Sequence, residues 1–193
     1  MKRGLKNKAD LLLALLYAGE GKPPDSRSSG EIAGITRLEK LLFILKMDEG
    51  LLTDVLREDN FNFVPFRMGP WTNEVYDEVD FLESLGLLKK RTGKRRSAAD
   101  AVHDDELFEA VILEKYQEDA AYTNHTAEVF SLTAEGREKA QAVWNRLSDE
   151  EKQKIISVKR KFNNMNLTQF LRYVYKKHPE YTAESEIKDY LRY

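Results

Sequence analysis

The sequence contains no cysteine. A disulfide framework, a thiolate metal site and a cysteine nucleophile are therefore all excluded. Long apolar runs are missing too, because the longest one near the start, residues 11–18, is far shorter than a membrane span. No small-residue cleavage site follows it, as one would in a signal peptide. We therefore expect a cytoplasmic protein that has no membrane partner.

The sequence also lacks an excess of charge of one sign, since its net charge is −2. The overall balance gives no reason to expect a nucleic-acid partner, but the charges are unevenly distributed. Residues 2–8, 89–96 and 152–161 are basic, whereas residues 100–119 hold eight carboxylates and one lysine. The ordinary explanation of such charge runs is a solvated surface.

The composition indicates a folded protein. Of the 193 residues, 41% are hydrophobic and 33% are charged, which is typical of a globular chain with a heavily charged helical surface. This length suits one domain with an appendage, or two small domains, and is too short for a large multidomain enzyme.

The apolar spacing predicts two helices and a strand in the first third of the chain. Residues 8–19 are dense in leucine and other helix formers, and residues 36–47 carry leucines three and four positions apart. Phenylalanines alternate with other residues over 61–66, which predicts a short strand. A turn at residues 68–70 is expected to close this strand, because it contains glycine and proline.

A third helix is expected to follow, with Thr72 as its N-cap and Gly86 as its C-terminal stop. Its predicted apolar stripe consists of Val75, Val79, Leu82 and Leu85. Residues 87–91 then predict a strand whose partner appears only at residues 129–132. The hairpin between these strands is therefore interrupted by a long insertion.

Side-chain caps predict the helices of the last third. Thr133 is expected to cap a helix that runs through Trp144, and Ser148 with Glu151 forms a capping box for a basic helix to about Phe162. The further helices are expected to begin at Asn166, which pairs with Gln169 as a cap, and at Ala183, and to end at His178-Pro179 and Leu191.

This order of elements is that of a winged helix-turn-helix, a mainly α fold with a small β component. We expect a winged-helix domain over residues 1–147, with an acidic insertion in the wing at about 97–127. Residues 148–193 are expected to form a C-terminal helical extension. The fold alone implies nothing about DNA.

Several stretches resemble known proteins: FNFVPFRMGPWTNEVYDEVDFLESLGLL (residues 61–88), ITRLEKLLFIL (35–45), FSLTAEG (130–136) and LTQFLRYVYKKHPEYTAES (167–185). Together they resemble the YwgA-like proteins and, more loosely, the Panacea (SocA-like) antitoxin domain. The resemblance spans roughly half of the chain. It implies a winged-helix-like fold and a role in toxin neutralisation or gene regulation.

The third helix is poorly suited to reading DNA. In a DNA-reading winged helix it would enter the major groove and present cations or amides to the bases. Here no lysine or arginine occurs between Arg67 and Lys89, and the predicted exposed positions are Asn73, Glu74, Asp77, Glu78, Asp80 and Glu83. Carboxylates facing the phosphates would weaken association. We therefore expect any DNA binding to be weak.

The wing gives an alternative, a transcriptional regulator that contacts DNA through the wing and the basic C-terminal helix. Wings of this kind lie along phosphates or in the minor groove. The candidate residues are Lys89, Lys90, Arg91, Lys94, Arg95 and Arg96. The competing hypothesis is that this cluster pairs with the acidic residues 100–119 within the chain.

The leading hypothesis is a protein-interaction module, antitoxin-like or an accessory factor, whose partner is a protein such as a toxin or a defence-system component. We also consider a homodimer. The turn at Gly69-Pro70 would display a few side chains rigidly. The predicted contact residues are Arg67, Met68, Gly69, Pro70, Trp71, Asn73 and Tyr76. The ordinary explanation of the aromatic residues here, which include Phe61, Phe63 and Phe66, is core packing.

Nothing in the sequence predicts catalysis or a cofactor. His103, Asp104 and Asp105 are adjacent on a polar insertion and would not converge on a metal ion. His125 and His178 stand alone and are expected to be surface or capping residues. No pair of carboxylates stands out for acid–base chemistry, and no glycine loop could cradle a phosphate. We therefore expect no catalytic residue, no metal site and no enzyme activity.

Overall fold

The computed structural model describes residues 4–19, 30–92 and 128–191. In these ranges the protein is mainly helical and contains small antiparallel sheets. The α-helices are α1 (Lys8–Tyr17), α2 (Ile35–Met47), α3 (Glu74–Ser84), α6 (Ala134–Trp144), α7 (Asp149–Phe162) and α8 (Leu167–Lys177). The helices expected up to residue 177 are thus confirmed, with small differences at their ends.

Three of the four predicted side-chain caps are confirmed, at Thr133, Ser148 and Asn166. The fourth is wrong, because the N-cap of α3 is Asn73 and not Thr72, although Thr72 Oγ1 accepts a hydrogen bond from the Glu74 amide at 3.3 Å. Thr133 Oγ1 accepts a hydrogen bond from the backbone amide of Gly136 at 3.0 Å and starts α6. Ser148 forms the complete capping box of α7, and Asn166 caps α8 through the amide of Gln169. Such caps satisfy amides that have no partner within the helix, so the sequence signal is local and direct.

The expected helix over residues 183–191 is wrong. The chain instead forms two short 3-10 helices, Pro179–Thr182 and Asp189–Leu191. Between them, the Glu186 amide donates to the carbonyl oxygen of Arg67 at 2.9 Å. An amide that bonds to a distant segment cannot make the helical bond four residues back, which explains the break.

A three-stranded antiparallel sheet has the order β1-β5-β4, with β1 at Ile32–Ala33, β5 at Glu128–Leu132 and β4 at Leu88–Thr92. Lys90 lies opposite Phe130 in the central pair, and Ile32 lies opposite Phe130 on the other side. The strands expected at 87–91 and 129–132 are confirmed. β1 was not predicted, because two residues are too few to show a strand period.

A second, two-stranded sheet is the hairpin of β2 (Val64–Phe66) and β3 (Gly69–Trp71), in which Phe66 lies opposite Gly69. The expected strand and turn are therefore shifted. The turn lies at Arg67-Met68, and Gly69 and Pro70 belong to the second strand. Phe61 and Phe63 precede the hairpin and are buried in the core. A short 3-10 helix, Arg57–Asp59, lies upstream.

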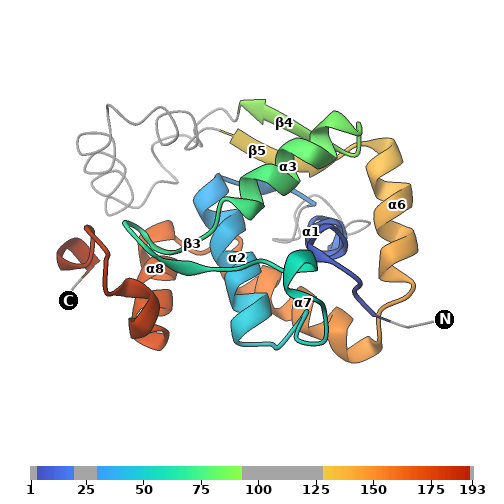
Figure 1. Ribbon diagram of the computed structural model, residues 1–193. Helices are drawn as coiled ribbons and strands as arrows, with labels where there is room; N and C mark the ends of the chain where they lie inside the picture. The colour runs from blue at the N-terminus through green and yellow to red at the C-terminus, as the bar shows by residue number, and fades with distance from the viewer. Residues whose placement is uncertain (1–3, 20–29, 93–127, 192–193) are drawn as a thin grey trace.

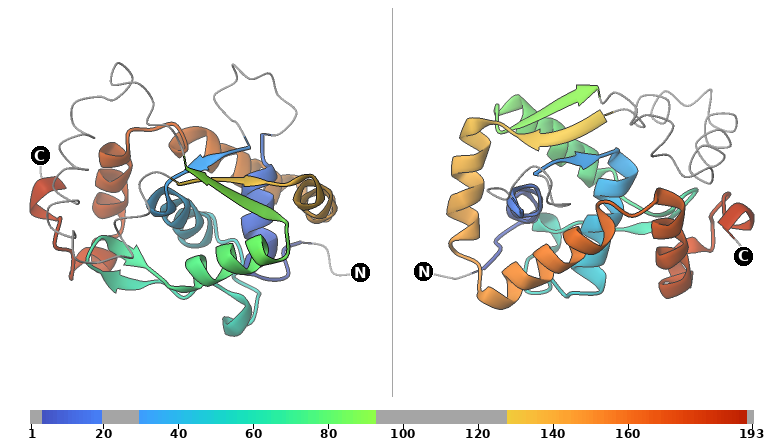
Figure 2. Two further views of the ribbon diagram at one scale, coloured as in Figure 1. Left: turned by 90° about the horizontal axis from the view of Figure 1, so that it is seen from above. Right: turned by 180° about the vertical axis from the view of Figure 1, so that it is seen from behind.

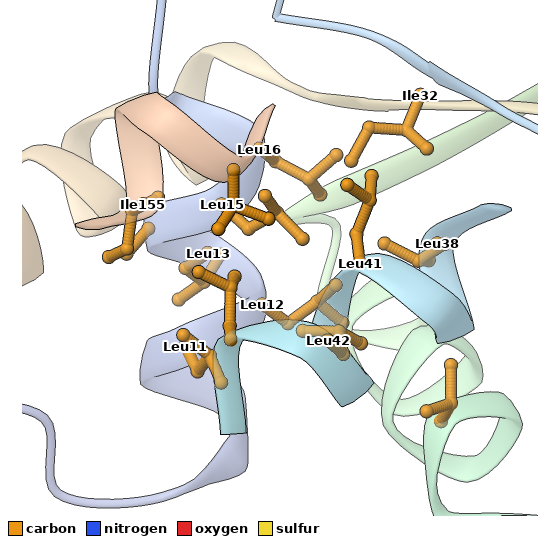
Figure 3. Close-up of a cluster of buried hydrophobic side chains, with 14 of the residues drawn as sticks. Leu11, Leu12, Leu13, Leu15, Leu16, Ile32, Leu38, Leu41, Leu42 and Ile155 are labelled. Carbon is orange, nitrogen blue, oxygen red and sulfur yellow. The ribbon is translucent and has the colours of Figure 1, made fainter. Parts of the chain in front are cut away.

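The core is built around α1, which lies in the middle of the molecule between α2, α6, α7 and the three-stranded sheet (Figure 1). Residues 10–16 of α1 are all buried. Figure 3 shows the leucines of α1 meeting Leu38, Leu41 and Leu42 of α2, with Ile155 of α7 alongside. The core therefore continues across residue 148 into the last two helices. None of the helices in the described ranges is long and apolar enough to cross a membrane.

Candidate protein-interaction surface

A buried ion pair fixes the β2–β3 hairpin to α2. Lys40 Nζ donates to Glu39 Oε2 at 2.7 Å and to the carbonyl oxygen of Pro70 at 2.6 Å. Glu39 Oε1 accepts from the amide of Thr72 at 3.1 Å. Both charged side chains are almost completely buried. Two consecutive residues of α2 therefore hold β3 on both sides of Trp71.

The environment of Glu39 acts on its ionisation in two directions. Burial raises the pKa of the Glu39 carboxyl above its ordinary value. The Lys40 ammonium and the Thr72 amide oppose this rise, because both favour the ionised form. Lys40 therefore limits the cost of keeping a carboxylate in the core.

Three of the residues predicted to contact a partner are buried in the chain and are not displayed at its surface as expected. Met68 packs in an apolar cluster formed by Leu171, Ile187 and Leu191. Gly69 has a φ of +86°, and a Cβ at this position would lie 2.9 Å from Cε2 of Tyr175. Pro70 is buried as well. The C-terminal segment, red in Figure 1, lies beside the hairpin and covers these residues.

The other predicted contact residues remain accessible to solvent. Asn73 is exposed, and Arg67, Trp71 and Tyr76 are partly exposed. The rings of Phe66 and Trp71 lie 4.9 Å apart between centroids, and the Arg67 guanidinium lies 5.7 Å from the Phe66 ring. The core packing expected for this pair is therefore only partial. The hairpin presents a small surface cluster of two aromatic rings and one cation.

We predict that Arg67→Glu changes the free energy of unfolding by less than about 1 kcal/mol. Arg67 Nε lies 3.3 Å from Glu186 Oε1, and both side chains are more than one third exposed, so the pair contributes little. The bonds that hold the C-terminal segment use the Arg67 carbonyl oxygen, which the substitution leaves in place. Urea unfolding monitored by circular dichroism tests this, with Glu186→Gln as the matched control. A loss of several kcal/mol would contradict it.

The described residues of the predicted basic wing are largely engaged with carboxylates of the same chain. Lys90 Nζ forms ion pairs with Asp80 and Glu83 of α3. Desolvation lowers the pKa of Lys90, but the hydrogen bonds to these two carboxylates outweigh it, and the pKa is raised. Arg91 pairs with Glu31 at 2.7 Å, and Lys89 is exposed. The other residues predicted to belong to the wing, Lys94, Arg95 and Arg96, and the acidic residues 100–119 lie outside the described residues.

The basic helix α7 uses one of its cations inside the protein. Lys159 is buried, and its Nζ donates to the carbonyl oxygens of Leu15, Leu16 and Ala18 at 2.7 to 2.9 Å. Lys154 forms an ion pair with Glu150 one turn earlier. The periodicity of α7 contains a signal for the burial of Lys159, because this residue lies on the same side of the helix as the buried residues Ile155, Val158 and Phe162.

Sequence reasoning missed the outer side of α3. The stripe predicted to be buried included Leu85, but Leu85 is 51% exposed and Phe81 is 54% exposed. The buried residues of α3 are Val75, Glu78, Val79 and Leu82. A helical projection would have set Phe81 apart, because it lies about 110° from the centre of the buried side at 3.6 residues per turn. Leu85 lies only about 70° from that centre, and it is exposed as the C-cap residue that ends α3. Figure 2 shows α3 along the outer edge of the molecule.

His178 was expected at the surface or as a cap, and it is the C-cap residue of α8, where it is buried. Its Nε2 lies 2.7 Å from Oδ1 of Asp48, the residue that ends α2, and Lys177 Nζ lies 2.7 Å from the other carboxylate oxygen. The His178 ring also packs edge-on against Phe43. This cluster joins the C-terminal ends of α2 and α8 and therefore has a structural explanation.

Over residues 4–19, 30–92 and 128–191, no three histidine, aspartate or glutamate side chains come together as metal ligands would. The hairpin cluster, the outer side of α3 and Lys89 of the predicted wing are accessible to solvent. Comparison of the chain with protein-family models, with curated proteins and with solved structures finds no match.

Proposed function

We propose that this chain is a non-enzymatic winged-helix module that binds another protein, as an antitoxin-like or accessory regulatory factor. The observation that carries the proposal is the surface of α3. This helix contains five carboxylates and no lysine or arginine, and Phe81 within it and Leu85 at its C-cap are exposed. Such a surface disfavours a polyanion and favours a protein partner, because apolar and aromatic side chains dominate protein interfaces.

The order of the elements supports the winged-helix assignment. A short strand between the first two helices, β1, pairs with β5; β4 follows α3 directly, and β5, its antiparallel partner, begins at Glu128 after the long insertion. In such a fold α3 is the helix that would enter the major groove, and the β4–β5 hairpin is the wing. The resemblance to YwgA-like and Panacea proteins supports the same assignment and suggests a toxin or a defence-system component as the partner.

We predict that the full chain binds duplex DNA weakly and without sequence preference. At about 150 mM salt its dissociation constant should lie in the nonspecific range of about 10⁻⁴ to 10⁻⁶ M. A fluorescence anisotropy titration against a random duplex pool, followed by sequencing of the bound fraction, measures both properties.

The matched variant carries Asp77→Lys and Asp80→Lys on α3, and it should bind duplex DNA more tightly than the original chain, since it adds cations where the original has carboxylates. Submicromolar, sequence-selective binding by the unmodified chain would overturn the proposed function. It would favour instead the regulator that contacts DNA through its wing.

A further inference from the structure

Two large apolar side chains are exposed on successive turns of α3. Phe81 and Leu85 are four residues apart, which places them next to each other on one side of a helix. Asp77 lies four residues before Phe81, and Ser84 lies three residues after it. Asp77 and Ser84 are both exposed. We call these four residues, Asp77, Phe81, Ser84 and Leu85, the Phe81 face.

The carboxylates around the Phe81 face differ in whether a cation of the same chain neutralises them. Asp80 and Glu83, on the side of α3 that faces Lys90, are paired with that lysine. Asp77 bonds only weakly to the neutral amide of Asn73, at 3.3 Å. Beyond Leu85, the carboxylate of Glu135 lies 3.8 Å from the position that a Cβ would take at Gly86. An apolar pair is thus bordered by carboxylates at both ends.

Resting on the proposed function, we propose that the Phe81 face docks a basic amphipathic helix of a partner protein. The apolar side of that helix covers Phe81 and Leu85, and its lysines or arginines meet Asp77 and Glu135. Helices of this kind bind through apolar anchors spaced three or four residues apart. The bordering carboxylates would set the orientation and exclude acidic competitors.

The same charges argue against a second copy of this chain as the occupant. In a two-fold dimer the same patch is present on both subunits. Two Phe81 faces in contact would bring the carboxylates of Asp77 and Glu135 against each other, and like charges at an interface disfavour association. An anionic lipid or nucleic-acid surface is disfavoured for the same reason.

Two synthetic helical peptides test this proposal. Both have leucine at i, i+4 and i+7, and they differ only in the flanking residues, which are lysine and arginine in one peptide and glutamate in the other. Titration of the full chain, followed by fluorescence anisotropy, should show micromolar binding of the basic peptide that weakens with added salt. The acidic peptide should bind at least about tenfold more weakly.

Phe81→Glu with Leu85→Glu should reduce binding of the basic peptide by about tenfold or more, because both anchors are lost. Leu56→Glu is the matched control, since Leu56 is 66% exposed and lies outside α3, and it should leave binding unchanged. Thermal unfolding checks that all variants fold. Equal binding of the two peptides, no binding of the basic peptide, or a basic peptide unaffected by the double substitution would each overturn the inference.

Sedimentation of the full chain alone adds one more outcome. A concentration-dependent dimer that Phe81→Glu abolishes would assign the face to a second copy and would also overturn the inference. These results are independent of the DNA titration. A selective DNA ligand would overturn the proposed function, whereas a peptide that binds elsewhere would overturn only the assignment of the Phe81 face.

Discussion

Replacing Lys159 with methionine is expected to lower the free energy of unfolding by about 3–5 kcal/mol. Lys159 Nζ is the donor for three buried carbonyl oxygens at the end of α1. The last carbonyls of a helix have no partner within the helix, and leaving a buried one unsatisfied costs about 1–3 kcal/mol. Methionine fills a similar volume but donates no hydrogen bond, so packing is preserved while the donor is removed.

Urea unfolding at neutral pH measures this loss, and Arg160→Met is its matched control. Arg160 is the next residue of α7 and is exposed, so its substitution should change stability by no more than about 0.5 kcal/mol. If the two variants lost the same small amount, the ammonium of Lys159 would not be what satisfies the end of α1. Heat unfolding of both variants gives an independent ranking.

The second large effect is expected from Lys40→Met, again about 3–5 kcal/mol, because removing one partner leaves a buried charge uncompensated. The unpaired group is Glu39, whose carboxylate still accepts from the Thr72 amide. The bond from Lys40 to the Pro70 carbonyl oxygen is lost as well. The β2–β3 hairpin should lose its fixed position before the rest of the protein unfolds, since Lys40 and Glu39 supply the side-chain hydrogen bonds from α2 to Pro70 and Thr72.

The sign of the pH dependence follows from Glu39. Burial raises the folded pKa of the Glu39 carboxyl above its ordinary value of 4.5, and in Lys40→Met the opposing effect of the ammonium is gone. Between 4.5 and the raised folded pKa, the native state binds more protons than the unfolded state, so stability falls as the pH rises. The variant should therefore be closest to the original chain below pH 4.5 and should lose most stability above its folded pKa.

Unfolding curves of Lys40→Met and of Glu39→Gln with Lys40→Met, taken across this pH range, test the linkage. The double variant removes the ionisable carboxyl and should recover part of the loss at neutral pH. A destabilisation of Lys40→Met that is the same at every pH would show that its cause is packing and not the buried carboxylate.

The helices could be predicted from the sequence because their signals are local. Thr133, Ser148 and Asn166 act within three residues of themselves, and each starts a helix where expected. The turn of the hairpin could not be placed in this way. Pro70 suggested a turn, but its carbonyl oxygen is held by Lys40, thirty residues earlier, and the backbone is extended there.

The candidate surface was only partly predictable for the same reason. Met68 and Gly69 were expected to be displayed, yet residues more than one hundred positions later cover them. Lys159 was grouped with solvated cations, since composition does not show which lysine of a basic helix faces a helix end. Leu85 was assigned to the buried stripe, but it is the C-cap of α3 and is exposed. The errors at Met68, Gly69 and Lys159 therefore come from contacts with distant parts of the chain, whereas the error at Leu85 is local and lies at the end of a helix.

The covering of the hairpin has a consequence for synthesis on the ribosome. The amide of Glu186 and the side chains of Ile187 and Leu191 complete the packing around Met68, and Lys159 completes the end of α1. All of these groups are synthesised after the hairpin and α1, which they complete. Until then, the apolar edge of the hairpin stays uncovered and only water can bond to the last carbonyls of α1, so these earlier elements cannot close before the later segments have been made.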